Sequence, residues 1–119
     1  MFTQAASGLE AIERLSLGQF DAAVLDLNMP DISGIEVLEF VRAQDRLRAL
    51  PIIVVTTRGD DDSRAQALAA GASEYMTKPF SPVALSATLT ELLTMSPTQR
   101  EDRRNDVLRK LRDESPSWR

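Results

Sequence analysis

The chain has 119 residues, of which 43% are hydrophobic and 27% charged, a balance typical of one soluble globular domain with its own core. Its net charge of −4 provides no basic field for DNA or RNA, so we expect no nucleic-acid partner. The absence of cysteine and histidine excludes disulfides, Cys/His zinc sites and catalysis by a thiol or an imidazole.

Three short runs of apolar and β-branched residues predict strands. They are AAVLDL at 22–27, PIIVVTT at 51–57 and SEYMTK at 73–78. The first two runs are apolar almost throughout, which is typical of parallel strands that helices cover on both faces. The third run is short and more polar, and we expect it to be the weakest strand.

Helical patterns precede, separate and follow these runs. Apolar residues recur at helical spacing in 8–17 and 34–44. Asp60 to Asp62 precede a third helical segment, and Gly71 follows it where a left-handed residue would end the helix. These aspartates could suggest a metal site, but capping and the helix dipole explain them better. Ser81-Pro82 begins a fourth helix that runs to about Met95.

The C-terminal segment starts at Ser96-Pro97, which ends the fourth helix. It is dense in charge and has an apolar patch of Val107, Leu108 and Leu111. We therefore predict two parts, a folded domain at 1–95 and a charged tail at 96–119. A helix with a solvated face is the structured form expected of that tail.

Alternating strands and helices predict a parallel α/β sheet, whose ligand site lies beyond the carboxyl ends of the strands. Asp26, Thr56 and Lys78 each end a predicted strand, so we expect their side chains to cluster. Thr57 could take the role of Thr56 in this cluster. Only the position of Thr56 in the strand, counted from Pro51, favours Thr56 over Thr57. Each residue alone has an ordinary interpretation: a turn aspartate, a strand threonine, a solvated lysine.

Three segments resemble, in this order, the signatures of response-regulator receiver domains: LDLNMPDISG at 25–34, PIIVVTT at 51–57 and GASEYMTKPF at 71–80. The start, AASGLEAIERL at 5–15, is similar to the second strand-to-helix junction of that family. The resemblance covers roughly residues 2–94. It implies a CheY-like, flavodoxin-like α/β fold with helices on both faces of a parallel sheet, and a phosphorelay receiver. We do not expect an enzyme, because the chain lacks a complete catalytic set and a glycine-rich phosphate loop.

The resemblance also implies the roles of the site residues. Asp26 would accept a phosphoryl group, while Thr56 and Lys78 would bind its oxygens. Tyr75 matches the aromatic switch that moves inward when the threonine engages the phosphoryl group, although a tyrosine here could simply be a half-buried packing residue. Met29-Pro30 and Gly34 would shape the loop after Asp26, and Lys78-Pro79 resembles the family's cis peptide.

The resemblance implies that a magnesium ion would bind Asp26 and the backbone carbonyl of Asn28, and that the Asn28 side chain would face the water that attacks the phosphoryl group. The family's other metal ligands are an acidic pair at the end of its first strand, and this sequence shows neither that strand, nor the pair, nor the first helix. We therefore expect an incomplete fold and doubtful Mg²⁺ binding. The strand near Phe2 would pair with the one around Val24, detach, or leave an edge for a second copy, giving a homo-oligomer.

These departures leave three interpretations open. The first is a working receiver that takes its phosphoryl group from a histidine kinase or phosphotransfer protein and signals to a downstream protein. The second is a pseudo-receiver, an interaction module independent of phosphorylation. The third is a natural chain that starts further upstream.

No apolar run approaches the ~20 residues of a membrane span, so we expect a cytoplasmic protein without a membrane partner.

Overall fold

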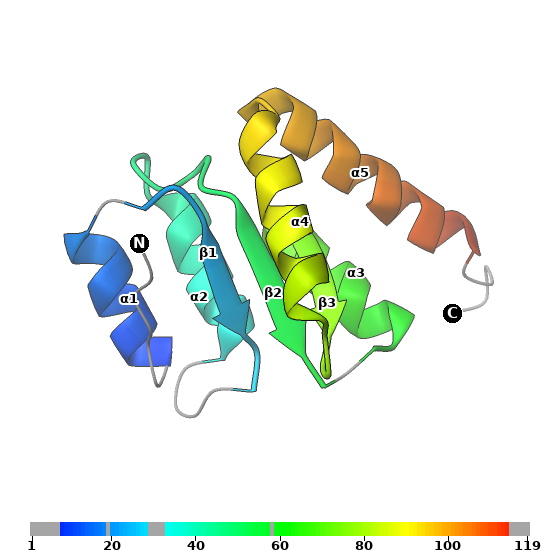
Figure 1. Ribbon diagram of the computed structural model, residues 1–119, viewed down its shortest axis with the longest axis horizontal. Helices are drawn as coiled ribbons and strands as arrows, with labels where there is room; N and C mark the ends of the chain where they lie inside the picture. The colour runs from blue at the N-terminus through cyan, green and yellow to red at the C-terminus, as the bar shows by residue number, and fades with distance from the viewer. Residues whose placement is uncertain (1–7, 19, 29–32, 58, 115–119) are drawn as a thin grey trace.

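The structure is a computed structural model, and it describes residues 8–18, 20–28, 33–57 and 59–114. All three predicted strands and all four predicted helices are present within a few residues of their expected bounds (Figure 1). A fifth helix forms at the C-terminal end, which is the structured form expected of the charged tail. In order, the elements are α1 (Gly8–Leu17), β1 (Ala23–Asp26), α2 (Gly34–Ala43), β2 (Ile52–Thr56), α3 (Asp61–Ala70), β3 (Glu74–Thr77), α4 (Pro82–Thr94) and α5 (Pro97–Glu114).

The strands form a parallel sheet in the order β1-β2-β3. The register sets Asp26 beside Val55, and Thr56 beside Thr77. The carboxyl ends of all three strands therefore meet at one edge, as the sequence predicted. A further strand near Phe2 would fall outside the described residues.

Alternate residues of β2 supply the two halves of the core. Ile52 and Val54 belong to the larger cluster, which α1, α2 and α3 cover, whereas Ile53 and Val55 belong to a smaller cluster completed by Leu92 of α4. All five residues of β2 are buried, as expected of a central parallel strand. Figure 1 shows α4 in front of the sheet, with α2 and α3 behind it.

The predicted helix ends are confirmed. The Asp60 side chain accepts hydrogen bonds from the backbone N–H of Ser63 at 3.0 Å, and Ser81 accepts one from Ala84 at 3.3 Å. Gly71 ends α3 with a φ of 122°, and an added Cβ would lie 2.5 Å from Cγ of Arg42. Both the backbone angle and the close approach require glycine at this position.

The C-terminal helix α5 packs against α3, with Leu111 buried in the larger cluster and Val107 and Leu108 partly buried against it (Figure 1). The expected apolar patch therefore faces the protein. The division into a domain at 1–95 and a tail at 96–119 stays a prediction. Among the described residues, the helices are all too short or too polar to cross a membrane.

Candidate functional site

Asp26, the last residue of β1, makes polar contacts through both carboxylate oxygens. Nζ of Lys78 lies 2.5 Å from Oδ2, and the backbone N–H of Asn28 donates to Oδ1 at 2.8 Å. About a third of each side chain of the ion pair is exposed: 32% for Lys78 and 37% for Asp26. The carboxylate is thus held in place by the protein while one side stays open to solvent.

The sheet brings Lys78 to Asp26 although 52 residues separate them in the sequence. The backbone N–H of Lys78 donates to the carbonyl of Thr56 at 2.7 Å, which continues the pairing of β2 and β3 by one residue. The peptide bond between Lys78 and Pro79 is cis, as the resemblance implied. The expected meeting of these two side chains at the carboxyl edge is therefore found.

Asn28 links the ends of β1 and β2. Its side-chain oxygen accepts a hydrogen bond from the backbone N–H of Thr57 at 3.1 Å, while its own N–H binds Asp26. Asn28 is thereby held against Thr57, the residue that follows β2. That the side chain of Asn28 faces an attacking water stays a prediction.

Thr56 and Tyr75 meet at a cavity of about 170 Å³ next to this edge. Thr56 is 1% exposed and Tyr75 is 8% exposed, and Asn28 lines the same cavity. Thr57, the alternative to Thr56, is exposed. Asn28 is therefore common to two groups of residues, the ion pair of Asp26 with Lys78 and the cavity of Thr56 with Tyr75.

The first residue of α2, Gly34, approaches the residue that follows β1 closely. A Cβ added to Gly34 would lie 2.1 Å from Cδ2 and 3.1 Å from Cα of Leu27, the residue after Asp26. Glycine at the start of α2 therefore allows the helix to pack beside the candidate site. Met29 and Pro30, predicted to shape the loop after Asp26, lie outside the described residues.

Sequence reasoning missed a capping box next to this site. The Ser33 side chain accepts from the backbone N–H of Glu36 at 3.2 Å, and the Glu36 side chain accepts from the backbone N–H of Ser33 at 3.3 Å. The signal was present, because serine followed three residues later by glutamate is the usual pattern of this motif. It fixes where α2 begins, and so how the loop after Asp26 ends.

The oxygen atoms around Asp26 are few for a magnesium ion. Mg²⁺ prefers six oxygens in a near-octahedral arrangement and is usually bound by one or two carboxylates together with waters or phosphates. Within 8–18, 20–28, 33–57 and 59–114, no three acidic side chains gather closely enough to hold a metal. Asp26 and the carbonyl of Asn28 are the oxygens predicted to bind the metal, and one carboxylate oxygen of Asp26 already binds Lys78. These residues fall short of a complete magnesium site.

Comparison with known proteins identifies the class. The family model for the response regulator receiver domain matches residues 1–90. The chemotaxis protein CheY of Pseudomonas aeruginosa is 37% identical over 89 residues, which is 75% of this chain and 72% of that protein. CheY-3 of Vibrio cholerae is 35% identical over a stretch of the same length, 68% of its own chain. This chain belongs to the response-regulator receiver domains.

Solved structures agree with the fold. A response regulator from Chloroflexus aurantiacus, described as putative, superposes with a TM-score of 0.72 at 33% identity, over 76% of this chain and 75% of that one. The receiver domain of a Pseudomonas aeruginosa sensor histidine kinase gives 0.72 at 29% identity, over 78% and 76%, and its structure has a magnesium ion coordinated in the active site cleft. The chain is thus a CheY-like receiver module of two-component phosphorelay signalling, as the resemblance implied.

Proposed function

We propose that Asp26 is the phosphoacceptor of this receiver and that Lys78 and Thr56 bind the transferred phosphoryl group. The observation that carries the proposal is the ammonium of Lys78, 2.5 Å from Oδ2 of Asp26 at the carboxyl edge of the sheet. A cation at this distance can stabilise charge on the phosphoryl oxygens as they approach the carboxylate. Both groups are partly exposed, so a phosphodonor protein can reach them.

The step is a phosphoryl transfer. A carboxylate oxygen of Asp26 forms a bond to phosphorus, and the bond from phosphorus to the imidazole nitrogen of a phosphohistidine breaks, leaving an imidazole that takes a proton from water. Lys78 would shift part of its contact from the carboxylate to a phosphoryl oxygen. The hydroxyl of Thr56 would donate to another, because Thr56 ends the strand next to Asp26.

We propose Tyr75 as the switch that reports this event. Its buried side chain shares the cavity with Thr56, so a movement of the Thr56 hydroxyl changes the space available to the ring. The partners proposed on this basis are a histidine kinase or phosphotransfer protein as donor and a downstream protein as target. The expected cytoplasmic location and homo-oligomer stay predictions.

The test is intact-mass spectrometry after incubation with a small phosphodonor such as acetyl phosphate and Mg²⁺. We expect a mass gain of one phosphoryl group in the wild type and in Asp45→Asn, a control at an exposed aspartate, and none in Asp26→Asn. A gain that persists in Asp26→Asn would place the acceptor elsewhere.

One observation favours a second function, the phosphorylation-independent interaction module. Asp26 is already paired with Lys78, and the described residues fall short of a complete magnesium site. If the wild type gains no mass with any phosphodonor while it stays folded, this second function is the better account.

A further inference from the structure

The C-terminal helix α5 lies beyond the part of the chain that the family shares. The family model ends at residue 90, and α5 runs from Pro97 to Glu114. The two residues Met95 and Ser96 separate it from α4. In Figure 1 it crosses the end of α4 and extends over α3, at the side of the sheet where β3 is the edge strand. Its contacts are therefore an addition to the receiver fold.

The apolar part of this contact is small. Leu111 is 7% exposed and belongs to the cluster that also contains Tyr75 and Leu68. Val107 and Leu108 are partly buried against the same cluster. Among the side chains that the structure describes in α5, Leu111 alone is buried. An 18-residue helix thus depends on few apolar contacts to hold it.

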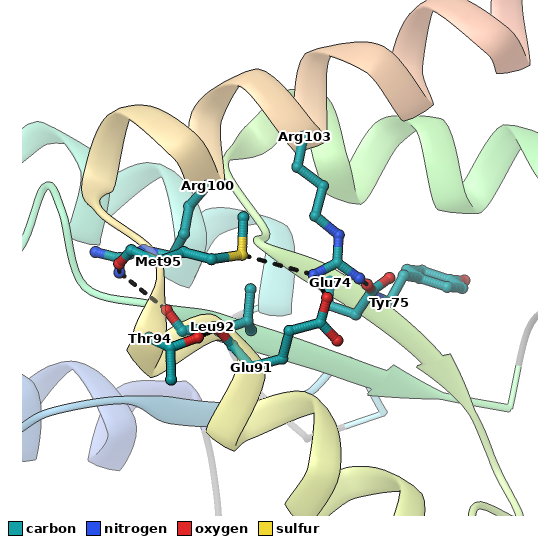
Figure 2. Close-up of polar contacts among 8 residues, drawn as sticks. All are labelled: Glu74, Tyr75, Glu91, Leu92, Thr94, Met95, Arg100 and Arg103. Atoms are coloured by element: carbon teal, nitrogen blue, oxygen red, sulfur yellow. Dashed lines mark hydrogen bonds and ion pairs between the residues drawn. The ribbon is translucent and has the colours of Figure 1, made fainter.

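The polar part of the contact comes from two arginines. Arg100 donates to the carbonyls of Leu92 and Met95 at 3.1 and 2.6 Å, and to the carbonyl of Ala49 at 2.8 Å. Arg103 makes the ion pairs. Its guanidinium donates to Glu74 of β3 and to Glu91 of α4, each at 3.0 Å, and contacts Sδ of Met95 at 3.8 Å. Figure 2 shows Arg103 reaching from α5 between the two carboxylates, beside Tyr75. Arg103 therefore joins α5 to β3 and α4 at once, while Leu111, eight residues later, packs on the side of α3.

The same interface contains unfavourable features. Nε of Arg104 in α5 is buried without a hydrogen-bond partner among the described residues. Arg42, under α5, has a pKa lowered to about 10, chiefly by burial and further by the charges of Arg104 and Arg100. An unsatisfied donor and neighbouring like charges oppose the attachment of α5. These features oppose the ion pairs and the few apolar contacts of α5, and a segment with few buried side chains is the kind that opens locally.

We propose that α5 is a displaceable cover, a helix that detaches as a unit at Met95 and Ser96 and exposes the surface of α3 and β3 beneath it. The occupant of that surface is α5 itself, since Arg103 pairs with Glu74 and Glu91, and the apolar patch of Val107, Leu108 and Leu111 packs against the cluster that contains Tyr75. The inference rests on the proposed function only in treating the chain as a signalling module. None of its tests requires a phosphoryl group on Asp26.

The first test is hydrogen exchange followed by mass spectrometry on the full chain. We expect the amides of α5 to exchange faster than those of β2 in the wild type. Arg103→Ala should raise the exchange of α5 roughly tenfold and leave β2 unchanged, and Glu91→Gln, which removes one of its two ion pairs, should raise it less. Arg109→Ala is the matched control, because Arg109 pairs with Asp106 inside α5 and should change nothing.

The second test uses a fluorescent peptide of residues 97–114, which keeps Arg103. We expect it to bind Arg103→Ala several-fold more tightly than it binds the wild type or Arg109→Ala, because the loosened helix competes less well for the surface. Two results would overturn the proposal: α5 exchanging together with β2, or the peptide failing to bind Arg103→Ala. Global unfolding of Arg103→Ala would count against it equally, since α5 would then be part of the core. A failed phosphorylation of Asp26 would leave all these outcomes unchanged.

Discussion

Leu92→Ala should destabilise the protein far more than Leu93→Ala, although the two residues are neighbours in α4. Leu92 is 0% exposed and is the α4 residue that completes the cluster of Ile53 and Val55, whereas Leu93 is 51% exposed. The two substitutions remove the same atoms from the same helix. Any difference between them therefore measures burial rather than helix propensity.

The magnitude follows from the size of the cluster. Truncation of a buried leucine to alanine lowers the free energy of unfolding by about 2–5 kcal/mol. The larger losses occur where the surrounding residues cannot relax into the cavity. Among the described residues, the buried members of this cluster are Ile53, Val55 and Leu92, and the other members, such as Leu89, are partly exposed, so neighbours can relax into the space. We therefore expect about 2–3 kcal/mol for Leu92→Ala and less than about 1 kcal/mol for Leu93→Ala.

The assay is urea unfolding followed by far-UV circular dichroism. With a slope of about 1–3 kcal/mol/M for a small domain, the midpoint of Leu92→Ala should fall by on the order of 1 M or more at an unchanged slope. Equal losses in the two variants would show that α4 is not anchored through Leu92. A changed slope would instead mean that the native state had lost α4 as a packed element.

Two further substitutions test the ends of α3. Asp60→Ala should lower the free energy of unfolding in urea by about 1 kcal/mol, because it removes the N-cap of α3, the carboxylate that accepts from the backbone N–H of Ser63. The control Asp61→Ala, in the first turn of the helix, should cost less. Gly71→Ala should cost about 1–3 kcal/mol, because φ is 122° and the new methyl group would meet Arg42; a loss below about 0.5 kcal/mol would contradict this account.

The strands, the first four helices and the meeting of Asp26 with Lys78 could be predicted because each depends on a local pattern. Apolar runs such as PIIVVTT identify a buried parallel strand, and the carboxyl ends of parallel strands meet at one edge in any register. The site follows from the strand ends alone. The capping box of Ser33 and Glu36 also had a local signal, S-x-x-E.

The docking of α5 could not be predicted in the same way. Its sequence is rich in charge, and a charged helix is usually a solvated one. The contact depends on Arg103 pairing with Glu74, 29 residues away in the sequence, and no local pattern distinguishes Glu74 from the other acidic side chains. Arg42 is similar, because its guanidinium donates to the carbonyls of Gly71, Arg48 and Leu50, which no side-chain pattern specifies.

Tyr75 connects the two parts of the molecule that the proposals concern. On one side it lines the cavity shared with Thr56 and Asn28, and on the other it belongs to the cluster that Leu111 of α5 completes. If Tyr75 moves when Thr56 engages a phosphoryl group, the packing under α5 must change with it, because a close-packed cluster cannot absorb a displaced aromatic ring without a neighbour moving. By the reciprocity of coupled equilibria, release of α5 would then also change how readily Asp26 holds a phosphoryl group.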